Sequence, residues 1–290
     1  MQNTQLNLNS NFYNVKIVCS GNIFEVYEYE FSQLRGFKRK YKPYGSNENE
    51  IYSDDDLEIV DDKEDIFYKE LKEKISARRR AEKVRRLINA NRNDLVTFLT
   101  LTFKENLIDI DIANKEFDKF TKRVNRYLQK NYNIKFKYVA VIEFQKRGAI
   151  HYHMLCNLPT DFKVQNNKSW KSKKQKEYEV FISQNLWKNG FCDCRSIEGV
   201  DNVGAYLWAY MIKDSSDKRL KGRKAFLYSV STLEKEKYLY LDTSEMNEKE
   251  KSQVLALLGI HENDNVYKKI FNYNEYTGFT TYKEYNKDRK

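Results

Sequence analysis

The chain has 290 residues, of which 40% are hydrophobic and 32% charged, enough for one large domain or two modest ones with a real core. Its 52 lysines and arginines against 42 acidic residues give a net charge of +10, which favours a polyanionic partner. No apolar run approaches the ~18 residues of a membrane span, the first residues lack a signal-peptide pattern, and four irregularly spaced cysteines make no disulfide framework. We therefore expect a soluble cytoplasmic protein with reduced thiols.

The N-terminal part is expected to be an accessory segment over residues 1–65. Alternating apolar and polar residues predict a short hairpin around Gly21-Asn22. Residues 45–65 are polar and acidic, which is typical of a loop or solvated linker.

A helix is predicted over residues 66–90, because Ala77, Ala81, Val84 and Ile88 form an apolar stripe at helical spacing. Between residues 78 and 86 only Glu82 is acidic, whereas a charged solvent face usually mixes both signs. We predict that this helix contacts DNA phosphates. The basic residues concerned are Arg78, Arg79, Arg80, Lys83, Arg85 and Arg86.

A strand follows over residues 95–103, rich in β-branched and aromatic residues, with Thr100 and Thr102 on one face. Nothing in their chemistry alone makes these threonines functional. The next helix, about residues 112–130, has an apolar stripe opposite a basic face, and that face is adequately explained by solvation.

The stretch over residues 141–156 predicts a β-hairpin that carries two of the three histidines of the chain. A three-residue loop ending at Gly148 places Glu143 opposite His151 and Val141 opposite His153. Residues two apart on a strand share a face, so both imidazoles and the carboxylate converge on one patch of the sheet.

A carboxylate and two imidazoles suit a divalent cation, and we predict that Glu143, His151 and His153 bind one. The alternative is a pair of core histidines with satisfied hydrogen bonds. The loop residues Lys146 and Arg147 are predicted to contact DNA.

Beyond this hairpin we expect a lysine-rich loop over residues 160–176, a short helix over 177–188 and a strand over 191–197. Cys192 and Cys194 fall on one face of that strand. Because no other Cys or His pair has suitable spacing for zinc, they are better explained as small buried residues.

A second helix, capped by Asp201, is predicted to carry two tyrosines and a lysine on one face. At about 100° per residue, Tyr206 and Tyr210 lie ~40° apart around the axis, and Lys213 lies within ~60° of Tyr210. Two amphipathic tyrosines at the rim of a core are the alternative. Residues 231–290 are expected to form a C-terminal accessory segment with a helix near residues 244–258.

Three stretches together resemble the HUH endonucleases, and more narrowly the rolling-circle replication initiators (Rep proteins) of small bacterial plasmids and phages. They are Phe98-Leu-Thr-Leu-Thr-Phe103, Gly148-Ala-Ile-His-Tyr-His153 and Asn202-Val-Gly-Ala-Tyr-Leu-Trp-Ala-Tyr-Met-Ile-Lys213. The resemblance covers about residues 75–230 and implies an α+β fold. In that fold a central antiparallel sheet, the HUH or ferredoxin-like palm, has flanking helices, and the tyrosine-bearing helix packs near the His-x-His strand. We place this nicking-joining endonuclease domain at residues 66–230.

The resemblance implies metal-dependent nicking and rejoining of single-stranded DNA at an origin hairpin through a 5′-phosphotyrosine. Mg²⁺ or Mn²⁺ would be the cofactor, Tyr210 the nucleophile and Lys213 its helper. A host helicase and polymerase in the bacterial cytoplasm would be partners, the polymerase extending the free 3′-hydroxyl.

One departure concerns the second tyrosine. Family members with two active tyrosines commonly read Tyr-x-x-Lys twice, but Ala209 stands at the first lysine position. We therefore assign Tyr210 as the primary nucleophile and Tyr206 as a second nucleophile or a residue that stacks on DNA. A transposase or mobilisation relaxase with the same chemistry, and an origin-binding regulator that does not cleave, are the alternatives. The order of the histidine and tyrosine motifs favours an initiator.

Overall fold

A computed structural model of the chain describes residues 9–36, 62–164, 170–195, 197, 200, 202–213, 217–220, 223–224, 226–274 and 277–288. For residues 62–72, 74, 209–213, 218, 265 and 271–274 it describes the backbone alone. The acidic loop predicted over residues 45–65 therefore lies outside the described residues as far as residue 61, and so does the predicted cap Asp201. None of the described helices is long and apolar enough to cross a membrane.

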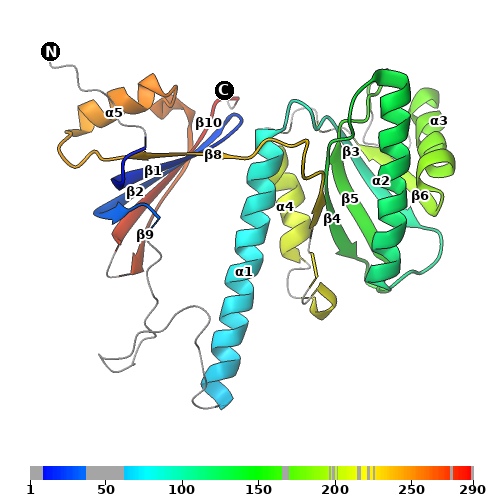
Figure 1. The fold of residues 1–290 in the computed structure, drawn as a ribbon, viewed down its shortest axis with the longest axis horizontal. Coiled ribbons are helices and arrows are strands. Elements are labelled where there is room, and N and C mark those ends of the chain that lie inside the picture. The colour runs from blue at the N-terminus through cyan, green and yellow to red at the C-terminus, as the bar shows by residue number, and fades with distance from the viewer. Residues whose placement is uncertain are drawn as a thin grey trace. The chain divides into compact units, whose positions relative to one another are not determined.

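The described residues form two five-stranded sheets with helices packed on them, an α+β fold as the sequence predicted (Figure 1). The chain divides into a terminal unit, residues 1–19, 24–75 and 237–290, and a central unit, residues 20–23 and 76–236. The sequence left open whether the two flanks form separate domains. Strands from both flanks lie in one sheet of the terminal unit.

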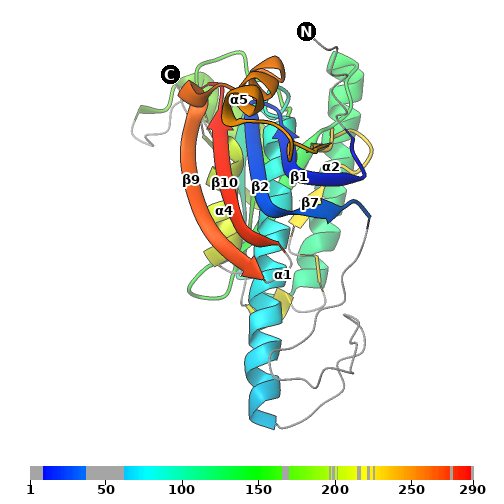
Figure 2. The same cartoon turned by 90° about the vertical axis from the view of Figure 1, so that its left-hand side faces the viewer.

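The sheet of the terminal unit has the strand order β8-β1-β2-β10-β9, and Figure 2 shows β1, β2, β10 and β9 side by side. Its β1–β2 hairpin turns at Gly21-Asn22, as predicted, and β1 pairs antiparallel with β8, with Val15 opposite Leu241. Helix α5 begins after Asn247, whose side chain completes a capping box with Glu250. The elements are β1 (Phe12–Ser20), β2 (Ile23–Leu34), β8 (Lys237–Leu241), α5 (Glu248–Leu257), β9 (Asn265–Asn274) and β10 (Gly278–Asn286), with a 3-10 turn at Glu262–Asp264.

The sheet of the central unit has the order β6-β3-β5-β4-β7, and all its neighbouring strands are antiparallel. Helix α1 passes from one unit into the other, since the division falls at residues 75 and 76. The elements are α1 (Asp62–Ala90), β3 (Thr97–Phe103), α2 (Ile110–Tyr132), β4 (Tyr138–Phe144), β5 (Ile150–Cys156), α3 (Lys173–Phe181), a π-helical turn (Ile182–Trp187), β6 (Gly190–Arg195), α4 (Val203–Lys213), a 3-10 turn (Lys218–Leu220) and β7 (Phe226–Tyr228).

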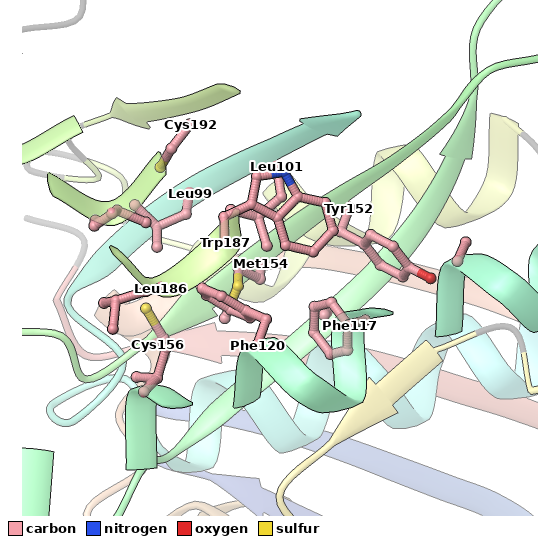
Figure 3. Close-up of a cluster of buried hydrophobic side chains, with 14 of the residues drawn as sticks. Leu99, Leu101, Phe117, Phe120, Tyr152, Met154, Cys156, Leu186, Trp187 and Cys192 are labelled. Atoms are coloured by element: carbon pink, nitrogen blue, oxygen red, sulfur yellow. The ribbon is translucent and has the colours of Figure 1, made fainter. Parts of the chain in front are cut away.

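Each face of the central sheet has its own apolar core. On one face α2 and the π-helical turn pack against the sheet, and Trp187 and Tyr152 are fully buried beside Phe117 and Phe120 (Figure 3). The strand residues of this core include Leu99, which alternates along β3 with residues of the other face. The side chains in this core are large and apolar, so this face is committed to packing rather than chemistry.

The opposite face is covered over part of its length by α1 and α4. The predicted stripe of Ala81, Val84 and Ile88 on α1 is fully buried, together with Val203 and Leu207 from α4. Strand residues Phe98, Val139, Val141 and Leu155 complete this core. The next residues along the same face of the strands are polar, and they form the candidate site.

Two details of the sequence analysis are settled by the fold. Cys192 and Cys194 are buried free thiols, and burial raises the pKa of Cys194 to about 12. The short helix begins at Lys173, inside the segment predicted as a lysine-rich loop, because Ser172 caps it by accepting a hydrogen bond from the Gln175 amide.

Candidate functional site

The β4–β5 hairpin has the register that the sequence predicted. Glu143 lies opposite His151 and Val141 opposite His153. The Gln145 amide donates to the Ala149 carbonyl at 2.9 Å, and Gly148 adopts a positive φ of 88°. A left-handed residue at that point costs glycine nothing, so the turn fixes the register and hence the face on which both histidines lie.

Both histidines are buried, and their side chains are bonded differently. His153 Nε2 lies 2.6 Å from Glu143 Oε2, so the carboxylate engages the diagonal histidine rather than His151, which it faces. His151 Nε2 is buried and has no hydrogen-bond partner within the described part of the chain. Burial lowers the pKa of His151, and the neighbouring His153 and Arg147 lower it further against an opposing effect of Glu143. At neutral pH His151 is therefore a neutral imidazole, the form that binds metals.

Strand β3 contributes a row of polar groups behind the histidines. Thr100 lies opposite His153 and Thr102 opposite His151. The Thr100 hydroxyl is 3.0 Å from His153 Nδ1, and the Thr102 hydroxyl is 3.5 Å from His151 Nδ1. The sequence analysis noted that these threonines share a face and gave them no role. The missing signal was the pairing of β3 with β5, which a single sequence does not give.

Aromatic rings connect the histidines to helix α4. The Phe98 ring stacks on the His153 ring, with centroids 6.0 Å apart, and Tyr206 meets Phe98 edge-on at 5.2 Å. Helix α4 packs on β4 and β5, as expected for the tyrosine-bearing helix. The side chains of Tyr210 and Lys213 lie outside the described residues, although their backbone continues α4 beyond Tyr206 by one and two turns.

Helix α4 is held at its N-terminus by two asparagines. Asn202 Oδ1 accepts a hydrogen bond from the Ala205 amide, which makes Asn202 the cap in place of the predicted Asp201. From α1, Asn89 Oδ1 accepts from the Gly204 amide. A Cβ on Gly204 would lie only 2.4 Å from the Arg85 carbonyl oxygen, so α1 and α4 approach closely at this glycine.

Arg195 is a further residue that sequence reasoning missed. It lies opposite Phe98 at the end of β6 and its Nε donates to Asp193 at 2.9 Å. The hydrogen bond to Asp193 is the main reason why the pKa of Arg195 is raised, and a hydrogen bond to Tyr206 raises it further. Tyr206, which lacks a lysine partner at Ala209, thus has a guanidinium beside its phenol.

The predicted DNA contacts lie on two exposed elements. On α1, Arg79 and Lys83 are exposed on the side away from the buried alanines, and Arg78 lies 3.5 Å from Glu82. Arg80 donates to Ser76, while Arg85 and Arg86 are half-buried. In the hairpin loop Lys146 and Arg147 are exposed, and Arg147 donates to Gln145.

The donor set is chemically suited to a divalent cation, although its atoms contact each other. Among the described residues, no group of three or more His, Cys, Asp and Glu side chains is already spaced as ligands of one ion. Adjacent ligands of an octahedral ion with bonds of about 2.1 Å are about 3.0 Å apart, close to the 2.6 Å between His153 Nε2 and Glu143 Oε2. His151 Nε2, which has no partner among the residues that the structure describes, supplies a third donor. Small side-chain rotations would therefore fit the set to an ion.

The fold and the site together define an α+β domain of the HUH-palm type, in which a His-x-His strand lies centrally in an antiparallel sheet beside a tyrosine-bearing helix. Residues 96–215 match the model of a family described as replication-associated protein ORF2, which fits a rolling-circle replication initiator. The match covers less than half of the chain and includes β3, the hairpin and α4. No curated protein and no solved structure gave a significant match. A replication-associated protein would bind DNA, and the family supports an endonuclease role in general.

Proposed function

We propose that the central unit nicks and rejoins single-stranded DNA at a replication origin hairpin through a covalent tyrosine intermediate, as a rolling-circle initiator. The observation that carries the proposal is the convergence of Glu143, His151 and His153 on one sheet face, next to the helix that bears both tyrosines. The family match over residues 96–215 supports the same reaction class.

The metal-binding residues would be His151 and His153 through Nε2, and Glu143 through its carboxylate. A divalent ion bound there would polarise the scissile phosphate and stabilise the charge that develops on its oxygens. Burial keeps His151 neutral, which leaves a lone pair available without competition from a proton at neutral pH. The threonine hydroxyls behind both rings hold their orientation.

The reaction itself is a transesterification. The Tyr210 oxygen attacks phosphorus and loses its proton to solvent, the bond from phosphorus to the 3′-oxygen breaks, and that oxygen takes up a proton. The products are a 5′-phosphotyrosyl enzyme and a free 3′-hydroxyl that a host polymerase would extend after a host helicase opens the duplex. Lys213, one turn further along α4, would bind the phosphate or favour the phenolate by its charge.

Basic residues around the site would hold the DNA. Arg79 and Lys83 on α1, and Lys146 and Arg147 in the hairpin loop, are exposed and would contact the backbone phosphates. Tyr206 would act in a second transfer that rejoins the strand, with Arg195 supplying the positive charge that Ala209 does not.

Trapping of the covalent product tests the proposal. A pool of 3′-end-labelled single strands with a hairpin and a randomised loop is incubated with the full chain and Mn²⁺ or Mg²⁺, and then denatured and run on a gel. A labelled band at the mobility of the protein is expected with the ion and not with excess EDTA. DNA binding without this band at any loop sequence would instead identify a binding protein that does not cleave.

Substitution of the two tyrosines tests which one attacks first. Tyr210→Phe removes the nucleophilic oxygen and is expected to abolish the adduct, while Tyr206→Phe, the matched loss of one hydroxyl a turn away, should retain it. Adduct formation by Tyr210→Phe together with its loss in Tyr206→Phe would contradict the assignment of Tyr210 as primary nucleophile.

A further inference from the structure

The two histidines of the site are each backed by a threonine from the same neighbouring strand. Thr100 and Thr102 lie opposite His153 and His151 in the β3–β5 register, and their hydroxyls face the Nδ1 atoms at 3.0 and 3.5 Å. The Nε2 atoms, on the far side of each ring, face Glu143 or have no partner among the described residues. One nitrogen of each ring is thus occupied by a threonine, and the other is turned toward the candidate ion site.

The hydrogen bond at His153 has a direction that depends on whether an ion is bound. Without an ion, Nε2 faces an ionised carboxylate that can only accept, so a neutral His153 carries its proton on Nε2 and its Nδ1 accepts from Thr100. With an ion, Nε2 must offer a lone pair, so the proton belongs on Nδ1, which then donates to Thr100. The ring loses one proton to solvent at Nε2 and gains one from solvent at Nδ1.

A hydroxyl is the group that can serve both arrangements, because it donates one hydrogen bond and accepts others. A backbone carbonyl in the same place would only accept, and would favour the ion-bound tautomer alone. A valine of the same shape would do neither. The identity of the residue opposite each histidine therefore affects how readily the ring changes from bonding Glu143 to binding an ion.

We propose that Thr100 and Thr102 are positioning residues of the ion site, which hold the rings of His153 and His151 by Nδ1 and reverse their hydrogen bonds when an ion binds. The inference rests on the proposed function, since it presumes an ion at the histidines. Thr100 makes the larger contribution because its hydrogen bond is the shorter of the two. These threonines contact neither the DNA nor the ion.

The first measurement is the affinity of the metal-free full chain for Mn²⁺ by calorimetry at one fixed pH. Loss of a group that orients a metal-binding histidine typically weakens binding about 10–100-fold, so Thr100→Val should bind at least about tenfold more weakly. Thr102→Val should lose less, and Thr100→Ser should retain most of the affinity because it keeps the hydroxyl.

The matched control is Thr97→Val, the same substitution on the opposite face of β3. Thr97 donates to the Leu158 carbonyl at 2.6 Å and does not touch the histidines, so this variant should lose stability and not Mn²⁺ affinity. Thermal unfolding of every variant is recorded alongside, which separates an unfolded protein from one that has lost an ion site.

The second measurement reads the tautomer directly, without any reaction. The chain has only three histidines, so long-range ¹H–¹⁵N spectra can be assigned with His151→Gln, His153→Gln and His261→Gln variants. His153 should carry its proton on Nε2 in the metal-free protein and on Nδ1 after addition of diamagnetic Mg²⁺. In metal-free Thr100→Val the ring should show a mixture of both tautomers.

The outcomes separate the inference from the function on which it rests. If the wild-type chain binds Mn²⁺ through His153 and Thr100→Val binds it equally well, or if Thr100→Ser fails to restore binding, the positioning role is wrong and the ion site stands. If the wild-type chain does not bind Mn²⁺, or binds it without His153, the proposed ion site is wrong and the role of the threonines falls with it.

Discussion

Lys171 is nearly enclosed by protein, with a side chain only 7% exposed, and it is held by two carboxylates. Its ammonium lies 2.5 Å from Glu179 on α3 and 2.6 Å from Asp193 on β6. Asp193 faces Thr100 across the strands, so this network adjoins the row of polar groups that ends at the histidines. Because a buried ammonium without partners is costly, the pair fixes the position of the segment that precedes α3.

Asp193 gives a prediction of pH dependence. Burial alone would raise the pKa of Asp193, but the hydrogen bonds from Lys171 and Arg195 outweigh it and leave the pKa below its ordinary value. A carboxyl group with a lowered pKa stabilises the fold above its unfolded pKa of about 3.9, and this contribution disappears as the pH falls through the folded pKa.

Asp193→Asn should therefore cost about 1.5–3 kcal/mol near pH 6 and progressively less on acidification, because the wild type loses the same charge. Urea unfolding of both proteins over a series of pH values from about 6 to about 3 measures the difference. A difference in unfolding free energy that stays constant over the whole series would contradict the role of the charge.

The register at the site shows what a single sequence can predict. Alternation along the strands and the glycine at the third loop position determined that Glu143 faces His151, and the structure confirms this. The sequence could not predict that the carboxylate would bond the diagonal His153, because that choice depends on side-chain rotamers within a packed site. It could not predict Arg195 beside Tyr206 either, since the two are brought together only by the packing of α4.

At the scale of elements, the close crossing of α1 and α4 determines where the tyrosines lie. The closest approach is at Gly204, and Asn89 and Asn202 bond each other and the first turn of α4. Alanine is ordinarily a better helix residue than glycine by up to ~1 kcal/mol, so the sign of a Gly204→Ala effect is informative.

Gly204→Ala should destabilise the protein by about 1–3 kcal/mol, because the new Cβ meets the Arg85 carbonyl and α4 must shift. Urea unfolding measures the loss. The yield of covalent adduct should fall as well, since a displaced helix misplaces Tyr210. Ala205→Gly is the control, because it costs helix propensity without creating a clash. A stabilised Gly204→Ala protein would show that the two helices can separate freely.

The basic surface of α1 predicts a specific dependence on salt. Arg79 and Lys83 are an exposed Arg/Lys pair four residues apart. Each phosphate of a single strand that the protein ceases to neutralise should reduce the slope of log affinity against log salt by ~0.7, so Arg79→Ala/Lys83→Ala should reduce it by ~1.4.

Fluorescence anisotropy with a labelled single strand at several salt concentrations gives the slope. Lys122→Ala/Arg126→Ala removes the same charges at the same spacing from α2, which packs on the other face of the central sheet, and should change the slope little. Equal changes in both double variants would mean that α1 attracts DNA only through net charge.

At the scale of the whole molecule, the two units have separate cores. Tyr285 is buried in the core of the terminal unit and Tyr152 in that of the central unit. Truncation of a large buried aromatic side chain to alanine costs about 3–5 kcal/mol. Alternation predicted the strands of the terminal unit, but not that β1 pairs with β8, because partners so distant in sequence leave no local signal.

Tyr285→Ala should lower the melting temperature of the terminal unit and leave the histidine NMR signals of His151 and His153 native. Tyr152→Ala, the matched loss of a buried tyrosine in the other unit, should do the reverse. Thermal unfolding followed by these signals and by circular dichroism checks both. A single transition shared by all signals in both variants would show that the units unfold together.

The position of the central unit in the sequence, between β2 and β8, has a consequence for synthesis on the ribosome. β2 ends at Leu34 and β8 begins at Lys237, and at about 5–20 residues per second this interval lasts on the order of 10–40 s. The central unit can fold during that time, while β1 and β2 wait for the later strands that flank them in the sheet. A nascent hairpin with two unpaired edges invites pairing with another nascent chain, so polysomes are where this protein is most exposed to misassembly.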